Sequence, residues 1–307
     1  MIEVRDVSRK FGNAVALDRV SFKVEPGEIV ALLGPNGAGK TTASRIIGGI
    51  LAPSSGTAIV DGVDVRDDPN TVRRRCGFVT DQPSLYERMT LRAYLSFFSA
   101  LFEVEHPEKR AMELALLLGL AERLDMRLGT FSRGMKQKVA IARGLVHDPP
   151  VLLLDEPATA LDPETARTLR EFIVSLRARH RAILLCTHDL DEAQRIADRV
   201  IVLYRGRVAR EGTTDALRAD DRPTFVLAYM GDESAARDAL ARLGFSAELA
   251  GANGTRLIRF RADDPGTTNP AILRALLDAG LRPLTLTREE RTLEDAYFAI
   301  VSEAKRS

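Results

Sequence analysis

The sequence has little that would bind it to a nucleic acid or place it inside a membrane. Among its 307 residues, 44 are Lys or Arg and 43 are Asp or Glu, so the net charge is +1. A balance this even removes the electrostatic argument for a nucleic acid or an anionic membrane surface as a partner. Apolar runs such as residues 151–154 fall far short of the roughly 20 residues of a spanning helix. We therefore expect a soluble chain, with any membrane crossing made by another chain.

Cysteine is also scarce. The chain holds two, Cys76 and Cys186, each in an apolar run far from the other. This spacing fits structural thiols in a reducing cytosol better than a disulfide framework. The opening residues 1–6 lack the basic start and apolar core of a signal peptide. These absences predict a cytoplasmic protein.

The length is about twice that of a typical domain, which predicts two folding units. Residues 2–33 have the pattern of short strands separated by turns, and residues 90–119 have apolar side chains at helical spacing. Beyond them, residues 151–154 and 182–186 are continuous apolar runs, each followed by a polar segment and a helix. Such runs are typical of a parallel sheet covered on both faces. The first two-thirds of the chain is thus predicted to be α/β.

The apolar pattern lapses around residues 220–223, where we place a linker. We therefore expect one domain over residues 1–219 and an accessory domain over residues 220–307. The predicted order in the second domain is β-α-β-β-α-β, the ferredoxin-like arrangement, followed by a last helix at residues 293–303. Its predicted strands are residues 224–229, 246–250, 256–261 and 283–287, and its helices are residues 233–243 and 270–279.

A phosphate-binding motif occupies the turn after the apolar run at residues 28–33. The sequence Gly34-Pro-Asn-Gly-Ala-Gly-Lys40-Thr41 fits the pattern G-x-x-x-x-G-K-[ST] between a strand and a helix. Its glycines let backbone N–H groups converge on phosphate oxygens, and the helix presents its positive end. We expect Lys40 to reach the β- and γ-phosphates and the Thr41 hydroxyl to bind Mg²⁺. The predicted nucleotide-binding residues are Gly34, Pro35, Asn36, Gly37, Ala38, Gly39, Lys40, Thr41 and Thr42.

Two adjacent carboxylates, Asp155 and Glu156, end the apolar run that begins at Val151. A buried charge is costly unless it meets a cation, and side chains alternate along a strand. We therefore predict that Asp155 holds Mg²⁺ and that Glu156 faces the attacking water as its base. His188, just past the next run, is predicted to bond the γ-phosphate and orient that water. Taken alone, such groups are also common as solvated strand ends or polar caps.

In this order, these residues resemble the nucleotide-binding subunits of ABC transporters. The segment Phe-Ser-Arg-Gly-Met-Lys-Gln at residues 131–137 is similar to the family signature L-S-G-G-Q, with Arg133 and Met135 replacing a Gly and a Gln. Ser132 and Gly134 keep a hydroxyl and a backbone N–H at a helix start, which can grip a γ-phosphate. The alternative for Ser132 is a helix cap alone.

The resemblance covers about residues 1–215. It implies a P-loop NTPase core with an antiparallel β subdomain and a helical insert at about residues 88–148. It also implies ATP and Mg²⁺ as cofactors, ATP hydrolysis, and a head-to-tail homodimer in which one signature completes the other subunit's phosphate site. Asp162 matches the loop at that dimer contact, and Phe11 is placed like the aromatic residue that stacks on adenine. A core role is the alternative for Phe11.

The family's glutamine loop is matched less closely. Ungapped comparison puts Asp81 at the position of the family's Gln, with Gln82 one residue on. We predict that Gln82 serves after a one-residue shift, as a γ-phosphate and metal ligand, and a modified role of Asp81 is the alternative. Residues 84–89 and the helical insert would then meet a transmembrane permease.

The variant signature, the second domain and residues 292–298 are similar to the branch that includes bacterial drug and polysaccharide exporters. This resemblance implies an export ATPase, peripheral on the inner face of the membrane through a permease encoded as a separate chain. ATP would close the dimer and hydrolysis would reopen it. The alternative is a soluble ABC ATPase acting on nucleic acid or ribosomes, although the chain has one cassette, a short insert and no basic stripe. The second domain would either pack on its twin or bind a regulator.

Overall fold

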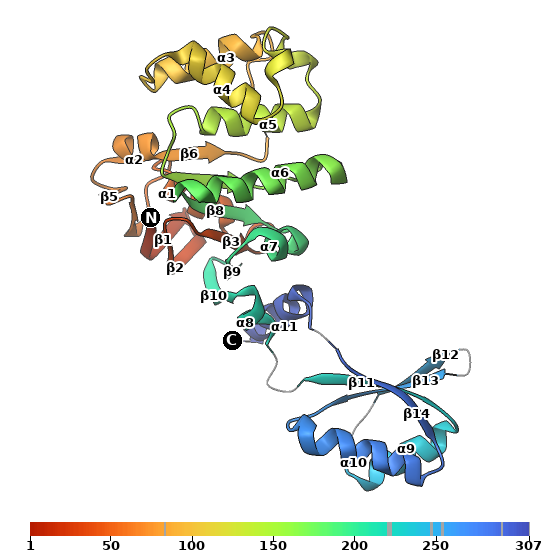
Figure 1. The fold of residues 1–307 in the computed structure, drawn as a ribbon. Helices are drawn as coiled ribbons and strands as arrows, with labels where there is room; N and C mark the ends of the chain where they lie inside the picture. The colour runs from red at the N-terminus through yellow and green to blue at the C-terminus, as the bar shows by residue number, and fades with distance from the viewer. Residues whose placement is uncertain (83, 220–222, 246–247, 253–254, 290, 307) are drawn as a thin grey trace. The chain divides into compact units, whose positions relative to one another are not determined.

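The computed structural model describes the chain except residues 83, 220–222, 246–247, 253–254, 290 and 307 (Figure 1). Its contacts divide the chain into Met1–Leu217 with Tyr297–Ser307, and Arg218–Ala296. We call these the first and second units. The expected boundary at residue 220 lies close to this division, but the chain from Tyr297 onward groups with the first unit. Within that unit Glu303 pairs with Arg210, which explains the grouping. Among the described residues, no helix is both long and apolar enough to cross a membrane.

The first unit contains an antiparallel sheet in the order β2-β1-β4-β5. This is the antiparallel β subdomain expected from the family resemblance. Its strands pair antiparallel throughout, and their inward side chains share one core with the helix that follows the phosphate motif. The strands are β1 (Ile2–Phe11), β2 (Ala14–Val24), β4 (Ser55–Val60) and β5 (Val63–Asp64).

A six-stranded sheet in the order β10-β9-β3-β8-β7-β6 forms the centre of the first unit. Five of its strands run parallel and β10 pairs antiparallel with β9 at one side. Strands β3, β7 and β8 are buried at every residue, as their continuous apolar runs predict. The strands are β3 (Ile29–Leu33), β6 (Cys76–Val79), β7 (Val151–Asp155), β8 (Ala182–Thr187), β9 (Arg199–Tyr204) and β10 (Arg207–Thr213).

Successive residues of the central strands face two different cores. In β7, Leu153 packs in the core shared with the antiparallel sheet, whereas Leu154 packs in the core shared with the helical insert. In β8, Leu184 and Leu185 divide in the same way. This alternation follows from strand geometry, because neighbouring side chains point to opposite faces. The central sheet therefore lies between the two cores and contributes one face to each.

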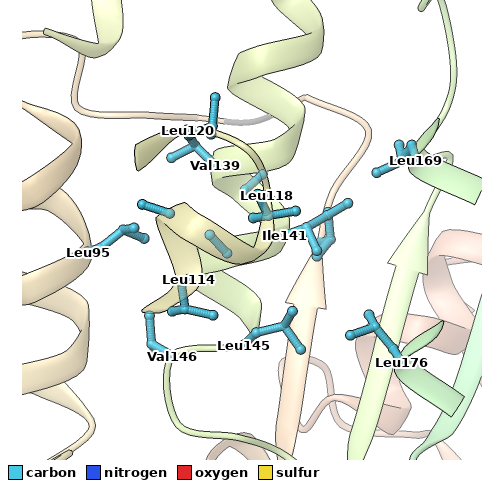
Figure 2. Packing of buried hydrophobic residues seen from close by; sticks show 14 of the residues in the cluster. Leu95, Leu114, Leu118, Leu120, Val139, Ile141, Leu145, Val146, Leu169 and Leu176 are labelled. Carbon is cyan, nitrogen blue, oxygen red and sulfur yellow. The ribbon is translucent and has the colours of Figure 1, made fainter. Parts of the chain in front are cut away.

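The helical insert consists of α3 (Leu91–Leu101), α4 (Pro107–Leu117) and α5 (Arg133–Gly144) with short turns between them. Figure 2 shows Leu95 of α3, Leu114 of α4 and Leu145 just past α5 in one apolar cluster. The remaining helices of the first unit follow the sheet strands. They are α1 (Lys40–Ile47), α2 (Pro69–Arg75), α6 (Pro163–Leu176), α7 (Leu190–Ile196) and α8 (Thr214–Arg218).

The second unit has the predicted β-α-β-β-α-β order, and its sheet runs β12-β13-β11-β14 with every pair antiparallel. This is the ferredoxin-like fold. Phe225, Leu227 and Tyr229 alternate along β11 and pack under both helices with Leu240 and Leu276. Its elements are β11 (Thr224–Met230), α9 (Glu233–Arg242), β12 (Glu248–Ala252), β13 (Thr255–Arg261), α10 (Pro265–Asp278) and β14 (Arg282–Arg288), and α11 (Leu293–Arg306) follows.

Helix α10 begins earlier than the sequence pattern predicts. The prediction took Pro270 as the first residue, whereas the helix starts at Pro265. Asp264 accepts a hydrogen bond from Gly266 N at 3.0 Å, and Pro265 occupies the first turn, where its missing N–H costs nothing. The cap therefore decides the start, and Pro270 lies inside the helix.

Candidate active site

The phosphate loop connects β3 to α1 and needs its glycines. Gly37 and Gly39 have φ values of +79° and +110°. A Cβ atom on Gly39 would lie 2.6 Å from the Ala16 carbonyl oxygen, and one on Gly34 would lie 2.4 Å from the Leu203 carbonyl oxygen. Gly39 gives α1 no side-chain cap, so the first N–H groups of the helix are left for an anion.

Lys40 lies within this loop and is only 6% exposed. Its Nζ donates to the Gly34 carbonyl at 2.6 Å and to the Pro35 carbonyl at 3.4 Å. The same ammonium is 3.8 Å from Glu156 Oε1. A phosphate bound in the loop could replace these carbonyl partners, so Lys40 is already placed for that contact.

Thr41 and Asp155 form a pair of oxygen donors beside the loop. Thr41 Oγ1 donates to Asp155 Oδ2 at 2.9 Å, and Asp155 is 4% exposed. Burial raises the pKa of Asp155, and the negative charges of Glu156 and Asp81 raise it further, against the Thr41 hydrogen bond and Lys40. Among the described residues, Asp155 Oδ1 has no hydrogen-bond partner. A cation here would supply that partner and offset the cost of burial.

A hydroxyl and a carboxylate are the hard oxygen ligands that Mg²⁺ prefers. Within the described parts of the chain, no three His, Cys, Asp or Glu side chains gather around one metal position. Mg²⁺ usually takes one or two protein oxygens and completes its shell with water and substrate phosphate. The Thr41–Asp155 pair therefore fits a Mg²⁺ ion that arrives with a nucleotide.

Glu156 begins the segment after β7 and turns away from Asp155. Its φ is +51°, a left-handed conformation that is uncommon for a residue other than Gly, and its N–H donates to the Cys186 carbonyl at 2.8 Å. Glu156 Oε1 is 2.8 Å from His188 Nδ1, and its Oε2 accepts from Thr159 Oγ1 at 3.0 Å. The structure thus brings Lys40, Glu156 and His188 together at the ends of neighbouring strands. Their catalytic roles stay predictions.

The signature and the Asp162 loop lie at the starts of two packed helices, α5 and α6. Ser132 caps α5 by accepting from Met135 N at 3.3 Å, and Asp162 caps α6 by accepting from Thr165 N at 2.9 Å. The Asp162 pKa is lowered, first by its hydrogen bonds with Thr165. A Cβ atom on Gly134 would lie 2.6 Å from Thr165 Cγ2, so the two helix starts are close. Within the described residues, none of these side chains hydrogen-bonds the phosphate loop.

Phe11, at the end of β1, is 48% exposed, which argues against the alternative of a core residue. The Arg9 guanidinium lies 4.6 Å from its ring centroid. Gln82 is exposed, and its backbone carbonyl accepts from Thr80 Oγ1 at 2.8 Å. Asp81, by contrast, is near enough to raise the pKa of Asp155. Asp81 is exposed as well, and its charge affects Asp155 less than burial, the Thr41 hydrogen bond and the charge of Glu156 do.

Two residues of this region escaped the sequence analysis. Thr159 holds Glu156 through a hydrogen bond, and Glu192, four residues after His188, is 2% exposed in α7. A Thr three residues after Glu156 is a weak signal in the sequence. For Glu192 the helical pattern gave a hint, because Glu192 takes the same side of α7 as the buried Ala193 and Ile196.

Comparison with known proteins agrees with this geometry. The ABC transporter family matches residues 17–159. The ABC transporter ATP-binding protein NatA of Bacillus subtilis is 39% identical, over 72% of this chain and 93% of its own length. The Nod factor export ATP-binding protein I of Burkholderia lata is 36% identical, over 97% of this chain and 96% of its own.

The fold comparison leads to the same family. A dimeric ATP-binding cassette, solved in a post-hydrolysis state with ADP and phosphate, has a TM-score of 0.64 and 29% identity, over 69% of this chain and 98% of its own. The loop, the carboxylates and the parallel sheet define a P-loop ATPase. The chain belongs to the ABC transporter family and is an ATP-binding, ATP-hydrolysing subunit of it.

Proposed function

We propose that this subunit powers export through a separate transmembrane permease, by binding Mg·ATP between two copies of itself. The observation that carries the proposal is the meeting of Lys40, Glu156 and His188 beside the Thr41–Asp155 pair. The export direction is supported by the Nod factor export protein, whose match extends over both units.

The residues of the site divide the work of hydrolysis. Thr41 and Asp155 would hold Mg²⁺, which supplies charge neutralisation at the phosphates. Lys40 binds the phosphates, and Glu156 accepts the proton of the attacking water. His188 now pairs with Glu156 at 2.8 Å. When the imidazole turns to the γ-phosphate instead, it leaves that carboxylate free to act as the base.

The second copy would complete the site with Ser132, Gly134 and Asp162. The exposed start of α5 carries the Ser132 hydroxyl and free N–H groups, which suit a γ-phosphate. The dimeric state of the ADP- and phosphate-bound relative supports this arrangement. Phe11 would stack on adenine, and Gln82 or its neighbour Asp81 would sense the γ-phosphate and metal.

A cluster of exposed apolar residues, two of them aromatic, supports the permease contact. Tyr86, Phe97 and Leu101 are exposed around α3, and the ring of Tyr86 lies 6.4 Å from that of Phe97. Grouped apolar side chains on a surface mark sites of interaction. We assign this cluster, with residues 84–89, to the permease contact, which would hold the subunit on the inner face of the membrane.

The second unit is proposed to hold two copies together between cycles. One face of its sheet is covered by α9 and α10, and the other face carries Val226, Ala228 and Leu257, of which Leu257 is exposed. This apolar strip, on the sheet face that α9 and α10 do not cover, suits packing against a second copy of the unit. The alternative partner is a regulator.

The decisive experiment compares the purified protein with Glu156→Gln. We expect the variant to lose turnover about 10²–10⁴-fold, because a positioned base is removed. We also expect it to bind ATP and, when Leu257→Asp is added to separate the second units, to double in mass with Mg·ATP by light scattering. Glu164→Gln, at an exposed carboxylate in the first turn of α6, is the matched control and should behave as wild type. Normal turnover in Glu156→Gln, or a mass that never changes with Mg·ATP once Leu257→Asp is added, would contradict the proposal. Stimulation by RNA would favour the soluble alternative.

A further inference from the structure

Glu192 is a buried carboxyl group that the catalytic scheme above does not use. It lies in the first turn of α7, four residues after His188, and is 2% exposed. Among the described residues, its Oε1 has no hydrogen-bond partner. Burying such a group costs free energy, so its position calls for a role.

Burial raises the pKa of Glu192 and the hydroxyl of Thr187, the last residue of β8, lowers it, which places these two side chains next to each other. Thr187 is fully buried, and its Oγ1 accepts from Asp189 N at 3.0 Å. Asp189 in turn accepts from the backbone N–H of Glu192 at 3.1 Å. Asp189 thus joins the Thr187 hydroxyl to the first turn of α7, and His188 is the one residue between Thr187 and Asp189.

The charges around Glu192 come from three places. The pKa of Glu192 is raised to about 7, mainly by burial. The negative charges of Asp189 and Glu156 also raise it, whereas the Thr187 hydroxyl and Arg170 of α6 lower it. Strand β3, which also packs on α7, carries only apolar side chains. The interaction with Glu156 matters most here, because Glu156 is the carboxylate that meets His188.

We propose that Glu192 is a positioning residue for ATP hydrolysis, which acts through the Thr187 hydroxyl to aim His188 at Glu156 and the γ-phosphate. The inference rests on the proposed catalytic role of His188. Because Glu192 is 2% exposed, we expect its effect to be on the geometry of turnover and not on ATP binding.

Glu192→Ala and Glu192→Gln in the full chain test this proposal. Alanine removes the carboxyl group next to Thr187, and we expect turnover to fall about 10- to 100-fold with the ATP dissociation constant unchanged, because misplacement of a reacting group by about 1 Å has effects of this size. Glutamine keeps a hydrogen-bonding group of the same shape, and we expect it to restore most of the turnover. The imidazole signals of His188, followed by NMR, should shift in Glu192→Ala and stay near wild type in Glu192→Gln.

Two control variants distinguish the proposed role of Glu192 from that of His188 and from a purely structural role. Glu164→Ala, in the first turn of α6, should leave turnover and the His188 signals unchanged. His188→Ala tests the proposed function itself, and normal turnover there would overturn the role of His188. Slow turnover in His188→Ala together with normal turnover in Glu192→Ala would overturn the role of Glu192 alone. A parallel loss of ATP affinity and turnover in Glu192→Ala, without rescue by Gln, would show a structural role and also overturn it.

Discussion

The two units of the molecule differ in the kinds of side chain that they bury. Among the described residues, every buried charged side chain belongs to the first unit, and Lys40, Asp155 and Glu192 all lie at or just beyond the carboxyl ends of its parallel strands. The second unit buries apolar side chains on one face of an antiparallel sheet. Parallel strands covered on both faces end in a sheltered crevice, where polar groups can be held out of water. The candidate active site therefore lies at the carboxyl ends of the parallel strands, where polar side chains can be buried together.

The largest effect is expected from a single methyl group in the phosphate loop. Gly39→Ala would place its Cβ 2.6 Å from the Ala16 carbonyl oxygen at a φ of +110°, so we expect ATP binding to be lost in an equilibrium binding assay. Gly244→Ala in the second unit is the matched control, because Gly244 has a φ of +73° with open space around it. We expect a cost of about 1–2 kcal/mol in unfolding free energy there and normal ATP binding. Similar ATP affinities in the two variants would remove the contrast between the units.

A smaller effect is expected in the loop that precedes the helical insert. Asp81 and Gln82 are both exposed, and the charge of Asp81 contributes to the raised pKa of Asp155. We expect Asp81→Asn to lower turnover and to raise the Mg²⁺ concentration at half-maximal rate, because a nearby negative charge is lost. Gln82→Ala is the comparison, measured over the same Mg²⁺ series. A larger loss in Gln82→Ala would favour the one-residue shift predicted from the sequence.

A substitution in the second unit is expected to change the mass of the nucleotide-free protein and to leave its turnover nearly unchanged. We expect Leu257→Asp to halve the mass of the nucleotide-free protein in light scattering, since a charge on the apolar strip opposes packing against a twin. Turnover at saturating Mg·ATP should stay within about twofold, because the site lies in the other unit. Leu277→Asp, at an exposed position of α10 on the helical side, is the control. An unchanged mass in Leu257→Asp would assign the strip to a regulator instead.

The smallest effect is a change in how stability depends on pH. The pKa of Glu192 is raised from 4.5 to about 7, so the folded chain holds this proton where the unfolded chain has lost it. Stability from this group is therefore present below about pH 4.5 and is lost as the pH rises to about 7. Glu192→Gln cannot ionise, and we expect its melting temperature to exceed that of wild type more at pH 8 than at pH 5. An equal difference at both pH values would contradict this.

Much of the fold was predictable because it depends on local pattern. The continuous runs at β7 and β8 predicted buried parallel strands, and the phosphate motif predicted the turn before α1. The start of α10 was wrong because the cap at Asp264 outweighs the apolar period. The burial of Glu192 and the approach of Asp81 to Asp155 were beyond prediction, since both depend on how distant elements pack. The catalytic roles themselves still await measurement.

The division of β7 between two cores has a mechanical consequence. Leu153 and Leu154 are joined by one peptide bond, yet each is locked into a different half of the first unit. Asp155 is the last residue of the strand, and Glu156 follows it directly. We therefore expect a displacement of the helical insert to reach Glu156, the proposed base, through the few residues of this strand. Strand β7 would then couple the proposed permease surface of the helical insert to the proposed site of ATP hydrolysis.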